Sequence, residues 1–278
     1  MIADETLVRA DLHAGPGAGT PIEKMPAHWL MARLGKRVLR PGGREATRWL
    51  LEHARIDGSD DVVELAPGLG LTAQAILACR PRSYVGVERD AAAARATARA
   101  IEAAARGSSA RVVHADAAKT GVSDGGASVV IGEAMLSMQP PRRKEAILAE
   151  AARVLRPGGR YLIHELAVVP DDVDPDRHAR LERDLSSSIK VGVRIGTQAQ
   201  WRAWLEEAGF AVERARLFPM RLLELDRLIQ DEGWARTVRF IWNAIRTPGA
   251  RARLASVRAT FRTYGANLRA IAIAARRA

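Results

Sequence analysis

The sequence predicts an α/β fold, built on a mostly parallel sheet with helices on both faces. Three observations support this prediction. Short apolar segments alternate with helical ones between about residues 62 and 166, which is typical of a doubly wound parallel sheet. The stretch 62–73, VVELAPGLGLTA, changes from strand to helix through a Pro-Gly-x-Gly break. The chain of 278 residues is 47% hydrophobic, which is enough to bury a core.

The turn that follows the first predicted strand indicates a ligand site. Gly68 and Gly70 suit a turn that needs positive φ or that lets a ligand approach the backbone closely. The free N–H groups at the start of the next helix favour an anionic or polar ligand. Glu88 ends the next apolar strand, where a carboxylate can accept hydrogen bonds from ribose hydroxyls. The ligand should therefore carry a ribose.

The remaining elements are expected in order along the chain. Residues 1–21 form a loose arm, and helices at 27–39 and 44–54 precede the core. The core consists of strands at 62–66, 84–88, 111–114, 127–132 and 160–166 and of helices at 71–79, 90–105 and 141–155. An acidic linker at 171–176 leads to a helix at 177–187, a helix at 200–208 that Thr197 caps, and a strand at 210–218. Residues 219–267 contain helices at 221–231, 235–245 and 250–264, and a last strand occupies 270–277.

Four motifs, in order and correctly spaced, resemble those of class I S-adenosylmethionine (SAM)-dependent methyltransferases. Glu64–Gly70, ELAPGLG, resembles their first motif, an acidic residue followed by x-G-x-G-x-G. Glu88 matches the acid that ends their second strand, and Asp116 matches the acid that meets the adenine amino group. RVLRPGGR at 153–160 is similar to the helix and Pro-Gly-Gly turn before their fifth strand. The layout is most similar to the branch that contains ubiquinone and menaquinone C-methyltransferases.

This resemblance implies a fold, a cofactor and a set of contacts. The fold is Rossmann-like, with an antiparallel last strand. The cofactor is SAM, which gives up its methyl group by in-line displacement and leaves S-adenosylhomocysteine. The implied cofactor-binding residues are Glu64, Ala66, Pro67, Gly68, Gly70, Glu88, Arg89, Asp116, Ala117, Glu133 and Met135. No catalytic residue is assigned, and no metal site is expected, because the six histidines show no ligand spacing.

Two positions depart from the family pattern. Ala66 replaces the first glycine of the first motif, which costs little if its φ is ordinary. Ser128 stands where many relatives carry an Asp early in the fourth strand, so that contact is in doubt.

Residues near the end of the fourth strand and in the first helix are candidates for the acceptor side. Glu133 and Met135 are expected in the wall where donor and acceptor meet, and Glu133 is also a candidate for orienting or deprotonating the acceptor. His28 and Trp29 are candidates for the acceptor pocket, although a helix histidine is more often structural. The same alternative applies to His164 and Glu165, which close the fifth strand.

We expect four parts along the chain: an arm and cap helix (1–43), the SAM-binding core (44–218), a helical cap insertion (219–267) and the final strand of the core sheet (268–278). The family normally joins its last two strands by a short hairpin, so the helices at 219–267 are an insertion. Because ligands of open α/β sheets bind outside the carboxyl ends of the strands, the insertion is expected over that edge. The alternative is a helical subdomain away from the site.

The charge of the chain is concentrated near its C-terminus. Ten arginines and no acid lie between Arg236 and Ala278, and they account for +10 of the net charge of +11. The partners this favours are an acidic lipid surface, nucleic acid or an anionic substrate, and the alternative is an ordinary solvated helix face.

No apolar run is long enough to span a bilayer and no secretory signal is visible, so a cytoplasmic location is expected. The one cysteine, Cys79, allows no internal disulfide, and its flanks predict a buried thiol at a helix end.

The favoured function is methyl transfer to a small hydrophobic or lipid-like acceptor. The apolar chamber for it would come from the N-terminal amphipathic helix and from the later helices that carry Trp234, Phe240, Ile241, Trp242 and Ile245. One alternative is an RNA methyltransferase, although the Asn/Asp-Pro-Pro-aromatic tetrad of base methylation is missing and aromatic residues are sparse. Two others are an NAD-dependent oxidoreductase and a non-catalytic SAM-binding or membrane-surface protein. The oligomeric state is left open, with a dimer among the alternatives.

Overall fold

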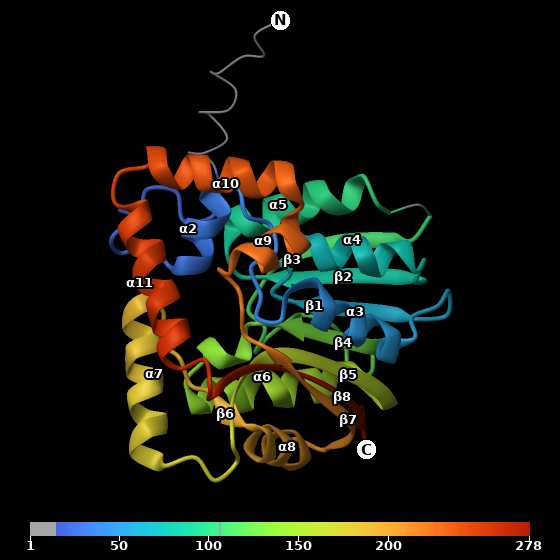
Figure 1. Cartoon of the computed structure of the whole chain (residues 1–278). Helices are drawn as coiled ribbons and strands as arrows, with labels where there is room; N and C mark the ends of the chain where they lie inside the picture. Colours follow the sequence, from blue (N-terminus) through green and yellow to red (C-terminus); the bar gives the residue numbers. More distant parts are fainter. Residues whose placement is uncertain (1–14, 106) are drawn as a thin grey trace, which may run out of the picture.

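One twisted sheet of eight strands runs through the molecule (Figure 1). The structure is a computed structural model, and it describes residues 15–105 and 107–278. The strand order is β3-β2-β1-β4-β5-β8-β7, and the short β6 pairs with β5. The strands are β1 (Asp61–Leu65), β2 (Ser83–Glu88), β3 (Ser109–His114), β4 (Ala127–Glu133), β5 (Leu155–Val168), β6 (Gly196–Thr197), β7 (Phe210–Pro219) and β8 (Leu268–Arg277). Strands β1 to β6 pair in parallel, whereas β8 runs antiparallel to both β5 and β7. The predicted fold class, including the antiparallel last strand, is confirmed.

The described helices agree with the predicted order, with small shifts at their ends. They are α2 (Ala27–Arg33), α3 (Gly43–Ala54), α4 (Leu71–Ala78), α5 (Ala91–Glu102), α6 (Pro141–Val154), α7 (Pro175–Ile189), α8 (Gln198–Glu207), α9 (Leu225–Glu232), α10 (Trp234–Arg246) and α11 (Ala250–Thr263), with a 3-10 turn at Leu136–Met138. Thr197 caps α8 with a reciprocal capping box to Gln200. Part of the predicted loose arm, residues 1–14, lies outside the described residues.

The first helix is shorter than predicted, because the segment after it is held by another part of the chain. α2 ends at Arg33 and not near residue 39. The buried carboxylate of Glu232, at the end of α9, accepts hydrogen bonds from the backbone N–H groups of Arg37 and Val38. Because those two N–H groups bond to Glu232, they do not donate within a continued helix.

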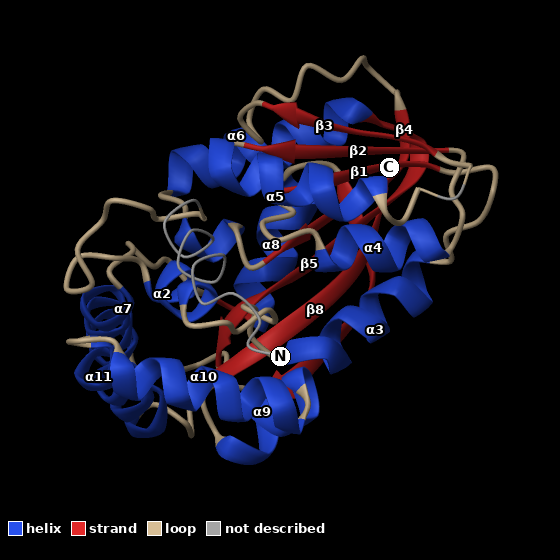
Figure 2. Ribbon diagram, turned by 90° about the horizontal axis from the view of Figure 1, so that it is seen from above, coloured by secondary structure: helices blue, strands red, loops and turns tan. Residues whose placement is uncertain are grey.

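Two cores cover the two faces of the sheet, and Figure 2 shows from above the helices that lie on those faces. On β1, Val62 packs into the core under α3 and α4, whereas Val63 packs into the core under α6 and α8. Leu162 and Ile163 on β5 divide in the same way. This alternation follows from the two-residue repeat of a strand that is buried on both faces.

A third core joins the start of the chain to the helices between β7 and β8. It contains Leu30 from α2, Leu34 at the C-cap of α2, Leu228 from α9, Phe240 from α10 and Val257 from α11. In Figure 1, α2, α10 and α11 lie together at one end of the sheet.

Within the described residues, no helix is both long and apolar enough to span a membrane.

Cys79 lies at the C-terminal cap of α4, but its side chain is exposed, and the prediction of a buried thiol is wrong. The helix ends there, and the left-handed residue Arg80 turns the chain away. The inward face of α4 is instead made by Ala73, Ile76 and Leu77.

Candidate functional site

A cavity of about 570 Å³ lies at the carboxyl ends of β1, β2 and β4. It falls in the size range of small-molecule sites. Ten of the eleven residues predicted to bind the cofactor line it: Glu64, Ala66, Pro67, Gly68, Glu88, Arg89, Asp116, Ala117, Glu133 and Met135. Gly70 does not. A Cβ on Gly70 would lie 2.7 Å from Ala100 Cβ, so this glycine allows α4 to pack closely against α5.

The glycine turn is organised around the carboxylate of Glu88. Glu88 is buried, and it accepts hydrogen bonds from Gly68 N (3.0 Å) and from Asp90 N (2.9 Å). Gly68 has a φ of +61°, and no heavy atom lies within 4 Å of the position that a Cβ would take on it. The turn thus leaves open space over its backbone at the cavity wall, as a ligand that approaches the main chain requires.

Two alanines at neighbouring strand ends adopt left-handed conformations. Ala66, after β1, has a φ of +54°, and Ala134, after β4, has a φ of +55°. The condition under which an alanine at position 66 would cost little, an ordinary φ, is therefore not met. Both residues line the cavity, and β1 pairs directly with β4. Such backbone strain is found most often at functional sites. The sequence did not predict it, because an alanine, unlike a glycine, does not indicate a positive φ.

Glu133, at the end of β4, is a buried carboxylate with four polar partners. It accepts hydrogen bonds from Thr47 Oγ1 (2.6 Å), Thr72 Oγ1 (2.6 Å) and His164 Nδ1 (2.8 Å), and it pairs with Arg40 Nε at 3.3 Å. Burial alone would raise the pKa of Glu133, but the charge of Arg40 and the hydrogen bonds from His164 and Thr47 lower it to about 2. Such a carboxylate is a weak base, so the geometry favours a positioning role over proton abstraction.

Glu64 has the opposite protonation behaviour. It is buried near the end of β1, and Tyr84 Oη donates a hydrogen bond of 2.6 Å to its Oε2. Burial raises the pKa of Glu64 to about 8, against the lowering effect of that hydrogen bond. At neutral pH a protonated Glu64 and an ionised Glu133 thus lie in the wall of the same cavity, and such a separation of pKa values is common in functional sites.

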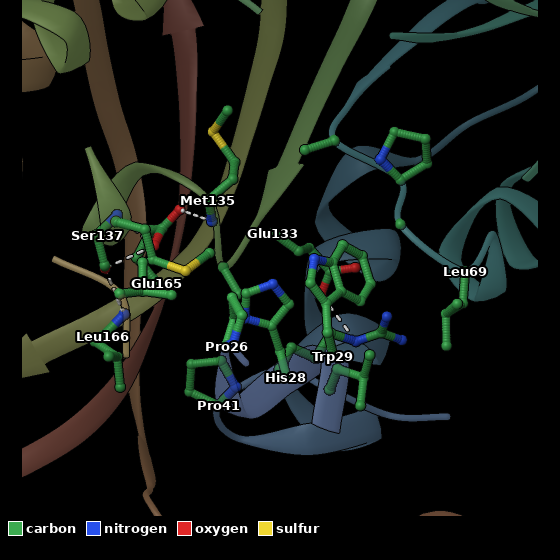
Figure 3. Close-up of a pocket in the computed structure, with 18 of the residues that line it drawn as sticks. Pro26, His28, Trp29, Pro41, Leu69, Glu133, Met135, Ser137, Glu165 and Leu166 are labelled. Atoms are coloured by element: carbon green, nitrogen blue, oxygen red, sulfur yellow. Dashed lines mark hydrogen bonds and ion pairs between the residues drawn. The ribbon is translucent and has the colours of Figure 1, made fainter. Parts of the chain in front are cut away.

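The loop after β4 is fixed by Glu165, for which the sequence left both a site role and a structural role open. The buried Glu165 carboxylate accepts hydrogen bonds from the backbone N–H groups of Met135, Leu136 and Ser137, and from Ser137 Oγ. Met135, Ser137 and Glu165 all line the cavity (Figure 3). Glu165 therefore positions the wall to which Met135 belongs.

Asp116 and Ser128 differ in where they lie. Asp116 lines the cavity and forms an ion pair with Arg143, which also lines it. Ser128 lies near the other end of β4, where its hydroxyl donates to Asp60 Oδ1 at 2.7 Å. Ser128 is not among the residues that line the cavity, in line with the doubt about that position.

The half of the cavity away from the glycine turn is largely apolar. His28 and Trp29 line the cavity, and in Figure 3 they lie between Glu165 on one side and Leu69 on the other. The remaining apolar wall comes from Met31, Leu39, Ile189, Val191, Met220, Leu222, Val257 and Phe261. Burial lowers the pKa of His28 to about 4, although the charge of Asp90 opposes the shift, so the imidazole is neutral at pH 7.

Of the two sources predicted for the acceptor chamber, the first helix lines the cavity, whereas the apolar residues between positions 234 and 245 do not. None of Trp234, Phe240, Ile241, Trp242 and Ile245 lines the cavity. Phe240 packs in the core shared with α2, and the other four are exposed. The reason is that α2 supplies the cavity wall at this place, through His28, Trp29 and Met31, while α10 packs against α2.

Comparison with known proteins agrees with this geometry. A family model described as a methyltransferase domain matches residues 62–159. A protein of Haemophilus influenzae (strain ATCC 51907 / DSM 11121 / KW20 / Rd), described as uncharacterized, is 33% identical over 219 residues, which is 79% of this chain and 85% of that protein. The chain belongs to the class I SAM-dependent methyltransferases.

Solved structures share the fold of this methyltransferase. A SAM-dependent methyltransferase from Geobacter sulfurreducens, in complex with S-adenosylhomocysteine, has a TM-score of 0.65 at 18% identity and covers 91% of this chain and 98% of its own. Geranyl diphosphate C-methyltransferase from Streptomyces coelicolor A3(2) has a TM-score of 0.60 at 15% identity, with coverage of 84% and 80%. The [4+2]-cyclase SpnF has a TM-score of 0.64 at 17% identity, with coverage of 84% and 80%. At these identities the likeness concerns the fold.

Proposed function

We propose that this protein transfers a methyl group from SAM to a small, largely apolar acceptor. The observation that carries the proposal is one cavity with two unlike halves. One half is the glycine turn with two carboxylates, and the other is an apolar wall built by α2, α11 and residues 220–222. A polar cofactor and an apolar acceptor would lie end to end in such a cavity.

The residues at the glycine turn fit the cofactor. The open space over Gly68 admits a ligand close to the backbone, and the carboxylates of Glu88 and Asp116 are acceptors for hydroxyl and amino groups. Leu69, Ala117 and Ile147 supply apolar surface in the same region of the cavity lining. When bound, SAM supplies an electrophilic methyl group on a sulfonium.

The chain itself would contribute alignment and exclusion of water. Glu165 fixes the loop that carries Met135, and Glu133 ties α3, α4 and β5 together at the end of β4. The neutral imidazole of His28 can accept a hydrogen bond from an acceptor in the apolar half. Its role would be to orient an acceptor that carries an O–H or N–H group.

Calorimetric titration with S-adenosylhomocysteine tests the cofactor half of the proposal, with NADH as the competing ligand. We expect binding of S-adenosylhomocysteine, no binding of NADH, and loss of binding in Glu88→Ala. Glu102→Ala, at the exposed end of α5, is the matched control and should bind normally. Binding of NADH, or full affinity in Glu88→Ala, would contradict the proposal.

A screen with isotopically labelled SAM tests the acceptor half. Apolar and amphiphilic small molecules should acquire label, and His28→Phe should lower turnover while S-adenosylhomocysteine affinity is retained. Methylation of RNA with steep salt dependence would instead support the nucleic-acid alternative.

A further inference from the structure

Helix α10 exposes an apolar stripe on the surface of the molecule. The side chains of Trp234, Val238, Trp242 and Ile245 are 70%, 60%, 57% and 62% exposed, and Ile241 is 39% exposed. Their spacing of i, i+4, i+7, i+8 and i+11 places them on one side of the helix. Monomeric proteins seldom expose so many large apolar side chains side by side, so the stripe indicates an interaction surface.

The stripe is not the result of a loosely placed helix. The other side of α10 is fixed by Thr237, Phe240 and Ala244, which are buried, and by Asn243, whose side-chain amide donates to Leu34 O at 2.9 Å. α10 therefore has one face in the protein core and an apolar face left over. In Figures 1 and 2, it lies along the outside of the molecule beyond α2.

Arg239 and Arg246 adjoin the stripe on α10, whereas Arg236 lies farther around the helix, and none of the three is used in holding the fold. Within residues 15–105 and 107–278, Arg236, Arg239 and Arg246 form no ion pair with a carboxylate, and all three are exposed. The guanidinium of Arg246 lies 5.4 Å from the centroid of the Trp242 ring. By contrast, Arg258 and Arg262 on α11 pair with Glu224, and Arg253 donates to backbone carbonyls of Met25 and Ser188.

We propose that α10 docks the protein onto the surface of an anionic lipid bilayer. Exposed tryptophans favour the interface between headgroups and acyl chains, and aliphatic side chains between them add buried apolar area. Unpaired arginines beside the stripe are attracted to anionic headgroups, and no acid follows Arg236 to weaken that attraction. Charge and apolar surface thus point to the same partner. This docking does not depend on the methyl-transfer proposal, since α10 lines no part of the cavity.

Vesicle co-sedimentation of the full chain tests the proposal, with vesicles of phosphatidylcholine alone or mixed with phosphatidylglycerol. We expect binding to the mixed vesicles, and binding that weakens with added salt. The variants W234A/W242A and R236Q/R239Q/R246Q should each weaken binding by about 10-fold or more. The matched controls are Leu217→Ala, an exposed apolar residue on β7, and R95Q/R99Q/R111Q, which removes three exposed positive charges elsewhere.

Quenching of tryptophan fluorescence by phosphatidylcholine brominated on its acyl chains, mixed with phosphatidylglycerol, locates the contact. We expect quenching in the wild type and little quenching in W234F/W242F, which keeps the stripe apolar. Absence of vesicle binding, equal binding to neutral vesicles, or equal loss in the charge-matched control would overturn the proposal. A dimer in light scattering that W234A/W242A abolishes, without vesicle binding, would assign the stripe to a second copy of the chain.

Discussion

Glu133 Oε2 lies 2.8 Å from Nδ1 of His164, and the two residues are register partners on the neighbouring strands β4 and β5. The same carboxylate bonds to α3 through Thr47 and to α4 through Thr72. A single buried charge thus joins two strands and two helices at the floor of the cavity.

Replacement of Glu133 by Gln should destabilise the fold by about 3–5 kcal/mol, because Arg40 then loses the charge that compensates it. The measurement is the free energy of unfolding in urea. The double variant R40M/E133Q removes both charges and should recover part of the loss. Equal stability of Glu133→Gln and the wild type would show that Glu133 is not the anchor described above.

The pH dependence of stability should carry the signature of Glu64. The unfolded chain loses this proton near pH 4.5, whereas the folded protein holds it to about pH 8. The stabilisation is therefore complete below pH 4.5 and is lost as the pH rises to about 8, by roughly 3–5 kcal/mol at most.

The variant Glu64→Gln isolates this contribution, since its amide does not titrate and can still accept the hydrogen bond from Tyr84. Denaturation at pH 5 and pH 8 should show a smaller fall in stability for Glu64→Gln than for the wild type. Identical pH slopes in the two proteins would mean that Glu64 is ionised in the folded state.

Two glycines of the same turn should respond differently to alanine. Both have positive φ, which costs about 1–2 kcal/mol for alanine. Gly70→Ala also places a Cβ 2.7 Å from Ala100 Cβ, so its stability should fall by about 1–3 kcal/mol more. Gly68→Ala meets no atom of the protein within 4 Å, but its methyl group enters the cofactor half of the cavity.

The readouts are urea denaturation and titration with S-adenosylhomocysteine. Gly68→Ala should weaken binding by roughly 10-fold, whereas folded Gly70→Ala should bind nearly as well as the wild type. The reverse order of affinities would place the ligand away from Gly68.

Relief of the left-handed strain at Ala66 should stabilise the protein. Ala66→Gly removes a cost of about 1–2 kcal/mol, partly offset by the entropy of glycine in the unfolded chain, for a net gain of up to about 1 kcal/mol. Ala98→Gly, inside α5, is the control and should instead cost about 1 kcal/mol. A loss of stability in Ala66→Gly would contradict the strain inferred from its φ of +54°.

Local signals were sufficient for much of the fold. Apolar strands, the Pro-Gly-x-Gly turn and helix-stop residues gave the order of the elements, because these patterns depend on neighbours in sequence. The end of α2 was predicted too late because it depends on a long-range contact. Glu232, which accepts the hydrogen bonds from Arg37 N and Val38 N, lies 195 and 194 residues farther along the chain than these two residues. The exposed stripe of α10 was predicted as a cavity wall, because periodicity shows that a face is apolar but not what covers it.

By itself, the sequence determined the fold class, the glycine turn and ten residues of the cavity wall, because the strand–turn–helix geometry of a parallel sheet places those positions at one edge of the sheet. Only the tertiary structure decided which groups are charged and what they hold. The ionised Glu133 depends on Arg40, Thr47 and His164, and the protonated Glu64 depends on burial beside Tyr84. Desolvation and long-range ion pairing act through space, so no pattern along the chain encodes them.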